Sequence, residues 1–340
     1  YPHDQHPNSD ITAPRAAIPR QSPSALPATS AGSHSKASCW IAAARSFWID
    51  SRIWHASVPT RRRCKIPTRG RCMHNNYIAG EWVASKEAVE NRNPSDISDL
   101  IGQYAQATTA QLETAIDAAA AAQKIWQATG LEARQTALMK IGNALIDRAD
   151  ELGELLSREE GKPRAEGRGE VYRAGQFFTY YAAEVLRQIG DNADSVRPGI
   201  EVDVRRDPVG VVAVISPWNF PTATAVWKIA PALAFGNAVI WKPANLVPAS
   251  AVALTEIIAD TGLPAGLFNL VMGAGSTIGD ALVSHPAIKA ITFTGSVETG
   301  RRIAAAAIGN MPRMQMEMGS KNALVVMDDA DIDLAVACAA

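Results

Sequence analysis

The stretch that decides the fold runs from Val209 to Pro243 and reads VGVVAVISPWNFPTATAVWKIAPALAFGNAVIWKP. Its first apolar run, Val209–Ile215, is rich in valine and too short for a lone helix, so it predicts a buried parallel strand. A helix follows, and then a second strand that ends at Trp241. The resulting βαβ unit places Asn219 and Lys242 at the carboxyl ends of its two strands, where ligands bind in open α/β sheets.

The same alternation of strands and helices continues towards the carboxyl end. The predicted elements are helix 248–261, strand 267–271, helix 277–284, strand 288–293, helix 297–307, strand 314–318, a short apolar run at 323–327 and a helix from residue 331. Four or five parallel strands joined by helices predict an α/β fold with a Rossmann-like parallel sheet. We assign residues 209–316 to this nucleotide-binding core.

Upstream of the core, the pattern predicts a helical amino-terminal part over residues 73–208. It begins with a hairpin at 77–83, turning at Gly80, and ends with an alternating strand at 200–205 that we expect at the edge of the cofactor domain. Between them we predict a loop at 93–96, helices at 108–127, 131–149, 151–158 and 165–188, and a loop at 190–198. Gly161 and Pro163, within Glu-Gly-Lys-Pro, predict a helix stop.

Composition limits the possible functions. The net charge of −1 over 340 residues gives no indication of nucleic-acid or membrane partners. The four cysteines show no metal-ligand spacing, so we predict no metal site and a reduced, cytoplasmic setting.

Residues 1–72 differ from the rest, with 11 Lys or Arg against 3 Asp or Glu. Met73 directly precedes the patterned region. We expect this segment to be disordered, as an upstream extension of the reading frame, a transit peptide or a basic tail.

Several polar residues could carry chemistry, although each has a plain structural alternative. Thr294-Gly295-Ser296 joins a predicted strand to a helix whose first amides favour an anion, but an ordinary serine cap fits equally. Lys242 could donate to sugar hydroxyls or phosphate, or be solvated. Asn219, between Pro217 and Pro221, could present an amide to developing negative charge, or bond its own backbone.

Glu317 lies between two methionines, which suggests a general base whose pKa is raised by apolar neighbours. A surface glutamate on an alternating strand is the alternative. The glycine-rich loop at 273–279 lacks the GxGxxG spacing, and we interpret it as a plain strand-to-helix turn.

Taken together and in this order, four motifs resemble the NAD(P)-dependent aldehyde dehydrogenase family. They are Pro217-Trp218-Asn219-Phe220-Pro221, Lys242-Pro243-Ala244, Phe293-Thr294-Gly295-Ser296 and Glu317-Met318-Gly319-Ser320-Lys321. The resemblance covers residues 73–340. Within the family, the chain is most similar to members that act on 2,5-dioxopentanoate (α-ketoglutarate semialdehyde).

The resemblance implies a role for each matching residue. Asn219 would stabilise the oxyanion, Glu317 would be the general base, and Lys242 would bond the adenosine ribose of NAD(P)+. Gly295 and Ser296 would meet the pyrophosphate. The remaining cofactor contacts that the resemblance implies are Ile215, Trp218 and Asn245.

The implied reaction oxidises 2,5-dioxopentanoate to 2-oxoglutarate through a cysteine thioester. We expect that cysteine beyond Ala340, so that residues 317–340 are only the start of a catalytic domain that is mostly missing, and the fragment itself is inactive. Cys338 lies too early and has the wrong neighbours. Asn245 occupies a position where many NAD-preferring members carry glutamate, so NADP+ should be tolerated. Ser320 replaces a common glycine.

For substrate choice, Arg173 and Gln176 are candidates to bind an ω-carboxylate, with a simple surface pair as the alternative. We expect the full-length protein to be a homodimer or homotetramer. The alternatives are another substrate, such as succinate semialdehyde, a non-catalytic cofactor-binding fragment, or an interaction protein acting through its basic first 72 residues.

Overall fold

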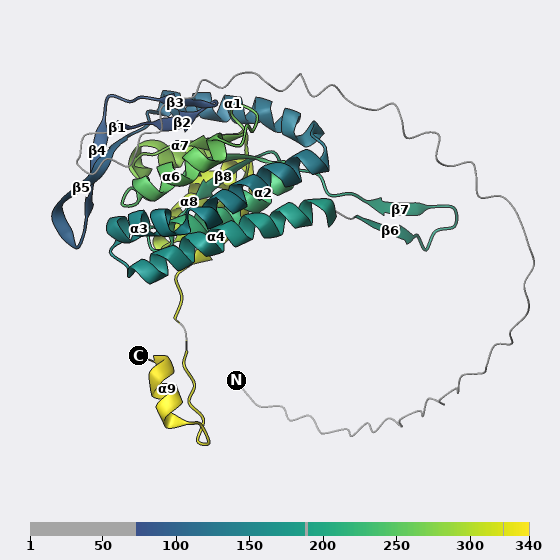
Figure 1. Cartoon of the computed structure of the whole chain (residues 1–340). Helices are drawn as coiled ribbons and strands as arrows, with labels where there is room; N and C mark the ends of the chain where they lie inside the picture. The colour runs from purple at the N-terminus through teal and green to yellow at the C-terminus, as the bar shows by residue number, and fades with distance from the viewer. Residues whose placement is uncertain (1–72, 188–189, 322, 340) are drawn as a thin grey trace, which may run out of the picture. The chain divides into compact units, whose positions relative to one another are not determined.

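The computed structural model describes residues 73–187, 190–321 and 323–339, so the expectation for residues 1–72 lies outside the described residues. Its centre is a seven-stranded sheet in the order β12-β11-β8-β9-β10-β2-β3 (Figure 1). The strands are β2 (Asn76–Ile78), β3 (Glu81–Val83), β8 (Val211–Ile215), β9 (Ala238–Lys242), β10 (Phe268–Leu270), β11 (Ile288–Gly295) and β12 (Arg313–Met318). The five from β8 to β12 run parallel, as predicted, and β2 pairs antiparallel with β10.

The helices agree with the sequence predictions to within a few residues. They are α1 (Thr109–Ala128), α2 (Leu131–Asp147), α3 (Ala149–Glu160), α4 (Arg164–Glu184), α5 (Pro221–Ala234), α6 (Pro248–Ala259), α7 (Asp280–Ser284), α8 (Val297–Ala307) and α9 (Ile332–Ala339). Thr108 caps α1 in a capping box with Gln111. Gly161 ends α3 at φ 92°, a left-handed conformation that favours glycine. None of the helices in the described ranges is long and apolar enough to cross a bilayer.

Valine-rich strands and alanine-rich helices make the core. All five residues of β9 are buried, as are Val211–Val214 of β8, because helices cover a parallel sheet on both faces. Helix α1 contacts β8, β9 and β10, and α5 contacts β8 and β9. The hairpin β2–β3 turns at Ala79 and Gly80, both with positive φ, as a two-residue turn requires.

Two predictions for the amino-terminal part were wrong. Residues 190–198, expected as a loop, include β6 (Asp191–Asp194), which pairs with β7 (Glu201–Val204) in a two-stranded sheet of their own. Strand 200–205 therefore does not lie at the edge of the central sheet. All eight strand residues are exposed, so no buried face was there to be recognised from the sequence.

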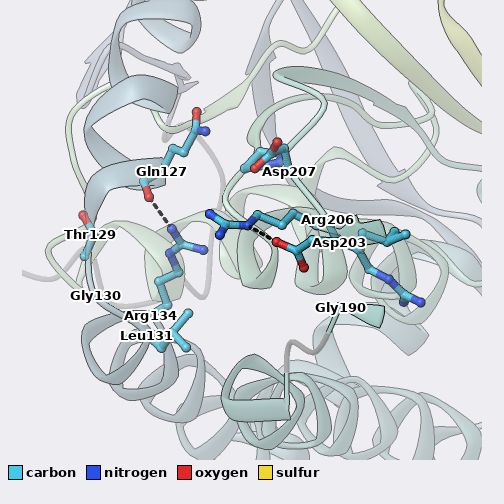
Figure 2. A pocket seen from close by; sticks show the side chains of 12 residues that line it. Gln127, Thr129, Gly130, Leu131, Arg134, Gly190, Asp203, Arg206 and Asp207 are labelled. Atoms are coloured by element: carbon cyan, nitrogen blue, oxygen red, sulfur yellow. Dashed lines mark hydrogen bonds and ion pairs between the residues drawn. The ribbon is translucent and has the colours of Figure 1, made fainter. Parts of the chain in front are cut away.

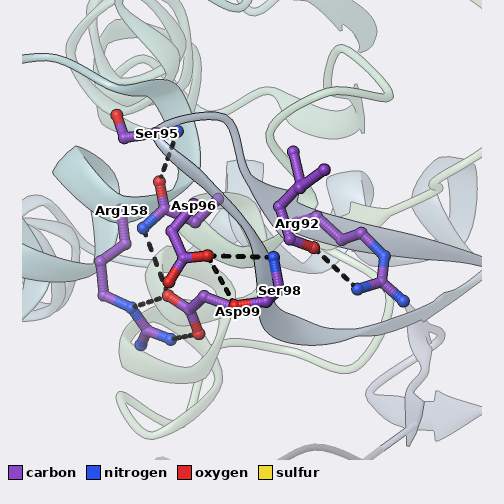
Figure 3. A network of polar contacts seen from close by, with 8 residues as sticks. Arg92, Ser95, Asp96, Ser98, Asp99 and Arg158 are labelled. Atoms are coloured by element: carbon purple, nitrogen blue, oxygen red, sulfur yellow. Dashed lines mark hydrogen bonds and ion pairs between the residues drawn. The ribbon is translucent and has the colours of Figure 1, made fainter.

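A second small sheet was not predicted. Strands β1 (Met73–His74), β5 (Asp96–Ala105) and β4 (Ala88–Asn93) lie in that order. The predicted loop at 93–96 joins β4 to β5. Next to it, Asp99 accepts two hydrogen bonds from Arg158, at 2.7 and 3.0 Å, which lower the pKa of Asp99 (Figure 3). This pair ties the β4–β5 hairpin to the last turn of α3.

The contact between α2 and α4 depends on two glycines. A Cβ on Gly175 would lie 2.8 Å from the Gly142 carbonyl oxygen and 2.6 Å from Ile146 Cγ1. We expect Gly175→Ala to lower the free energy of unfolding by about 1–3 kcal/mol through overpacking. Gly169→Ala on the same helix, with nothing within 4 Å, should raise it by about 0.5–1 kcal/mol. Urea unfolding of both variants checks this, and equal effects would contradict it.

Candidate functional site

The predicted site residues follow one edge of the sheet. Strands β8, β9, β11 and β12 are consecutive neighbours in the parallel half and end together in register. Ile215 at the end of β8 is paired with Lys242 on β9 and with Phe293 on β11. On the other side of β11, Thr294 is paired with Glu317. The strands therefore bring Asn219, Lys242, Ser296 and Glu317 to the same carboxyl edge.

Lys242 is a buried cation without an acidic partner. Its side chain is 7 % exposed, and Nζ donates one hydrogen bond, of 3.0 Å, to the carbonyl oxygen of Pro243. Across the described residues no carboxylate forms an ion pair with it, and burial lowers its pKa to about 8. An ammonium has three donors, so two remain for a ligand with hydroxyl or phosphate oxygens.

Ser296 is the N-cap of α8. Its Oγ accepts a hydrogen bond of 3.2 Å from the Thr299 amide, so the ordinary capping role is present. The serine is exposed, and the amides of Val297 and Glu298 have no partner within a regular helix. Gly295 is required locally, because a Cβ there would lie 2.6 Å from the Phe293 ring.

Two other helices that begin at this edge already hold a carboxylate. Glu170 accepts from the amides of Thr222 and Ala223 at the start of α5, at 2.9 and 3.0 Å. Glu159 accepts from the Ala249 and Ser250 amides at the start of α6. Burial raises the pKa of Glu159 to about 7 although these bonds favour the charged form. Helix α8 has no such cap in the described structure, which leaves its first turn open to an external anion.

Glu159 and Glu170 were not predicted from the sequence. A signal for Glu170 existed, because it shares the buried face of α4 with Gly167, Val171 and Ala174. A glutamate on an apolar helix face needs a partner. That partner lies 52 residues away in the chain and could not be identified from the pattern.

Asn219 is exposed, and the structure does not show the alternative in which it bonds its own backbone. The Asn219 side-chain amide makes no hydrogen bond to any described residue. Its main-chain carbonyl oxygen accepts one of 2.9 Å from Lys162. The neighbouring Trp218 is 53 % exposed, and Ile215 is half-buried. The turn is thus fixed through its main chain, while the side-chain donors are available.

Of the two surroundings considered for Glu317, the structure shows the surface glutamate on a strand, not the apolar setting of a base with a raised pKa. The Glu317 side chain is exposed and accepts a hydrogen bond of 2.9 Å from Gln315. The reason is the position of β12, an end strand of the sheet. Burial lowers the pKa of the nearby Lys228, and the negative charge of Glu317 partly opposes this effect.

Arg173 and Gln176 bond to each other. Arg173 donates to the Gln176 side-chain oxygen at 3.0 Å, one turn along α4, and Arg173 is exposed. This is the surface pair that the sequence analysis gave as the alternative. Binding of a substrate carboxylate by these two residues stays a prediction.

One cavity of the described structure lies away from the predicted residues. It has a volume of about 440 Å³ and is lined by Arg134, Asp203, Arg206 and neighbouring residues, none of them predicted for the site (Figure 2). Arg134 in this cavity donates to the carbonyl oxygens of Trp126 and Gln127. A smaller cleft, of about 280 Å³, is lined by Trp218 and Asn245 together with Glu159 and Glu160. Two predicted cofactor contacts therefore share one cleft at the carboxyl edge.

A parallel sheet with a buried lysine and an open helix start at its carboxyl edge is typical of dinucleotide-binding α/β proteins. Residues 82–340 match the profile of the Aldehyde dehydrogenase family. The chain belongs to this family, which confirms the resemblance.

Curated relatives agree with this assignment. The chain is 40 % identical over 263 residues to the alpha-ketoglutaric semialdehyde dehydrogenase of Bacillus subtilis (strain 168), covering 76 % of this chain and 54 % of the relative. It is 37 % identical to the NADP(+) succinate-semialdehyde dehydrogenase of Escherichia coli (strain K12), covering 76 % and 54 %. The chain thus spans about half the length of these relatives.

Solved structures show the same fold. The betaine aldehyde dehydrogenase of Staphylococcus aureus in complex with NAD+ superposes with a TM-score of 0.75 at 34 % identity, covering 78 % of this chain and 53 % of that one. The aldehyde dehydrogenase of Brucella melitensis biovar abortus 2308 gives 0.76 at 37 % identity, covering 78 % and 55 %. The α/β class with a Rossmann-like sheet is therefore confirmed.

Proposed function

We propose that the whole protein oxidises 2,5-dioxopentanoate to 2-oxoglutarate with NAD(P)+. The observation that carries the proposal is the alignment of Asn219, Lys242, Ser296 and Glu317 along the ends of four neighbouring strands, in a member of this family. The Bacillus subtilis relative, whose name gives α-ketoglutaric semialdehyde as its substrate, supports the choice of aldehyde.

The residues at the carboxyl edge fit a dinucleotide. The buried ammonium of Lys242 has donors to spare for ribose hydroxyls, and the open start of α8 suits a pyrophosphate. Ile215 and Trp218 would lie against the cofactor, which accepts a hydride from the substrate when it is bound. Asn219 would donate to the oxyanion that forms on the aldehyde oxygen when the nucleophile adds to the carbonyl carbon, and Glu317 would take a proton from the nucleophile or from water.

A comparison of substrates tests the proposed activity. The activity would be measured on the whole protein, in which we expect the nucleophilic cysteine. We expect the kcat/KM for 2,5-dioxopentanoate to exceed that for succinate semialdehyde, measured by NAD(P)H absorbance. A higher value for succinate semialdehyde would assign that substrate instead. Absence of turnover with every aldehyde, together with dinucleotide binding, would favour a non-catalytic cofactor-binding protein.

Asn245 provides a test of cofactor choice. It is exposed in the cleft beside Trp218, where a glutamate would bond the ribose 2′-hydroxyl and repel a 2′-phosphate. We expect Asn245→Glu to lower the affinity for NADP+ relative to NAD+ by about 10-fold, the equivalent of 1.4 kcal/mol. Isothermal titration with both cofactors measures the ratio. Asn245→Gln is the matched control, and an unchanged ratio in Asn245→Glu would contradict the position assigned to the ribose.

We also propose that the full-length protein is a homodimer or homotetramer. The hairpin β6–β7 supports this, because Ile200, Val202 and Val204 are exposed on it and its strands pair only with each other in the described structure. Exposed strand edges with apolar side chains favour pairing with another chain.

A further inference from the structure

Lys162 links three parts of the chain: the end of α3, helix α4 and the Pro217–Pro221 turn. Its side chain is 8 % exposed, and Nζ lies 3.0 Å from Glu160 Oε2 in an ion pair. The same nitrogen donates to Glu170 Oε2 at 2.8 Å and to the carbonyl oxygen of Asn219 at 2.9 Å. It also lies 4.1 Å from the centre of the Phe220 ring. The ammonium thus bonds two carboxylates while it holds the Pro217–Pro221 turn.

Glu170 extends this contact to the helix that follows the turn. While one oxygen accepts from Lys162, the other accepts from the Thr222 and Ala223 amides. Helix α5 has no side-chain cap of its own at Phe220, so Glu170 takes that place. The main chain from residue 219 to residue 223 is therefore held at both ends by one buried ion pair.

The energetics favour a fixed position for the turn. Burial alone would lower the pKa of Lys162, but the two carboxylates outweigh it and raise the pKa, so the cation persists. Charge-assisted hydrogen bonds are about twice as strong as neutral ones, and the side chains of the Lys162–Glu170 pair are only 8 % and 1 % exposed. Meanwhile the Asn219 side-chain amide bonds to no described residue. The contacts fix the backbone and leave the functional group free.

We propose that Lys162 is a positioning residue: through the Asn219 carbonyl, the Phe220 ring and Glu170, it sets where the Asn219 amide meets the substrate oxygen. This rests on the proposed function, in which Asn219 donates to the oxyanion. Lys162 itself does not touch substrate or cofactor in this account. A displacement of about 1 Å in such a donor can cost up to about 100-fold in rate.

The contact can be observed in the chain without any activity. The dipeptide Asn219-Phe220 is the only Asn-Phe pair in the sequence. Labelling asparagine with 13C at the carbonyl and phenylalanine with 15N therefore gives one carbonyl–amide cross-peak, which reports on the acceptor of Lys162. We expect Lys162→Met to shift the carbonyl resonance upfield, because it loses its donor, and to broaden it. Lys162→Arg, which keeps charge and donors, should preserve most of the wild-type signal.

Two further variants test whether a change in the cross-peak comes from loss of the Lys162 contact. The double variant Lys162→Met/Glu160→Met removes one charge of each sign. It therefore tests loss of the contact between Lys162 and the Asn219 carbonyl if Lys162→Met alone does not fold. It keeps the bonds from Glu170 to α5. Lys140→Met changes an exposed lysine elsewhere on the surface and should leave the cross-peak in place. An unchanged cross-peak in a folded Lys162 variant would overturn the inference, whatever the function of the protein.

Kinetics of the whole protein give the second readout. Positioning predicts that Lys162→Met lowers kcat about 10- to 100-fold, with dinucleotide affinity within about threefold of wild type. A purely structural role would change stability without lowering kcat selectively over dinucleotide affinity. A shifted cross-peak with unchanged kcat would support the position of the turn but contradict the oxyanion role of Asn219. The two proposals can therefore fail separately.

Discussion

Replacing Lys242 with methionine is expected to make the protein more stable and its dinucleotide binding weaker. The lysine is buried without a carboxylate, and its pKa falls to about 8, so the charged form is destabilised in the folded state. Removing it should raise the free energy of unfolding by about 2–3 kcal/mol at pH 7. Loss of its bonds to ribose should lower dinucleotide affinity about 10- to 100-fold, or 1.4–2.8 kcal/mol.

The pH dependence of this stability difference has a definite sign. Below pH 8 the lysine is charged in both folded and unfolded chains, and the cost of burying the charge is fully present. Between about pH 8 and its ordinary value of 10.5, the folded chain binds fewer protons, so wild-type stability rises. The advantage of Lys242→Met should shrink over this range. Urea unfolding of wild type and Lys242→Met at pH 7 and pH 9.5 measures this difference in the free energy of unfolding. Lys140→Met is the control and should change neither the stability at pH 7 nor its dependence on pH.

The largest kinetic effect is expected from Asn219→Ala in the whole protein. Loss of one oxyanion donor typically lowers kcat about 100- to 1,000-fold. KM and dinucleotide affinity should change little, since the Asn219 amide bonds to no described residue and its role arises with the transition state. Steady-state rates with saturating cofactor measure the effect.

Asn143→Ala is the matched control for this experiment. It removes an exposed amide from helix α2, outside the proposed site. We expect its kcat to stay close to wild type. If Asn219→Ala retained most of the wild-type kcat, or lost only substrate affinity, the oxyanion role would be wrong.

Local patterns were sufficient to predict the parallel half of the fold. The valine run before Ser216 predicted a buried strand, and Thr108 predicted the start of a helix. The structure has β8 and α1 at these positions. Strands β4 and β5 were not predicted from the sequence. Charged side chains such as Glu90 and Arg92, at alternate positions of β4, leave no apolar run to recognise. These strands are specified by pairing with each other, which the periodicity of a single segment does not reveal.

For the site, the sequence indicated which residues lie at the carboxyl edge but not what surrounds them. Asn219, Lys242 and Ser296 follow strand ends, so parallel pairing alone brings them to one side. The exposure of Glu317 depends on the place of β12 at the end of the sheet. The carboxylates of Glu159 and Glu170 reach helix starts 90 and 52 residues away, which are tertiary contacts without a local signal.

We propose that the dinucleotide binds at the carboxyl edge of the sheet and not in the larger cavity at Arg134. Hydrogen–deuterium exchange of the chain with and without NADH or NADPH distinguishes the two positions. We expect slower exchange in residues 215–219, 242–246 and 294–300, with residues 127–134 and 203–208 unchanged. Protection confined to the segments around Arg134 and Asp203, with the strand ends unaffected, would contradict it.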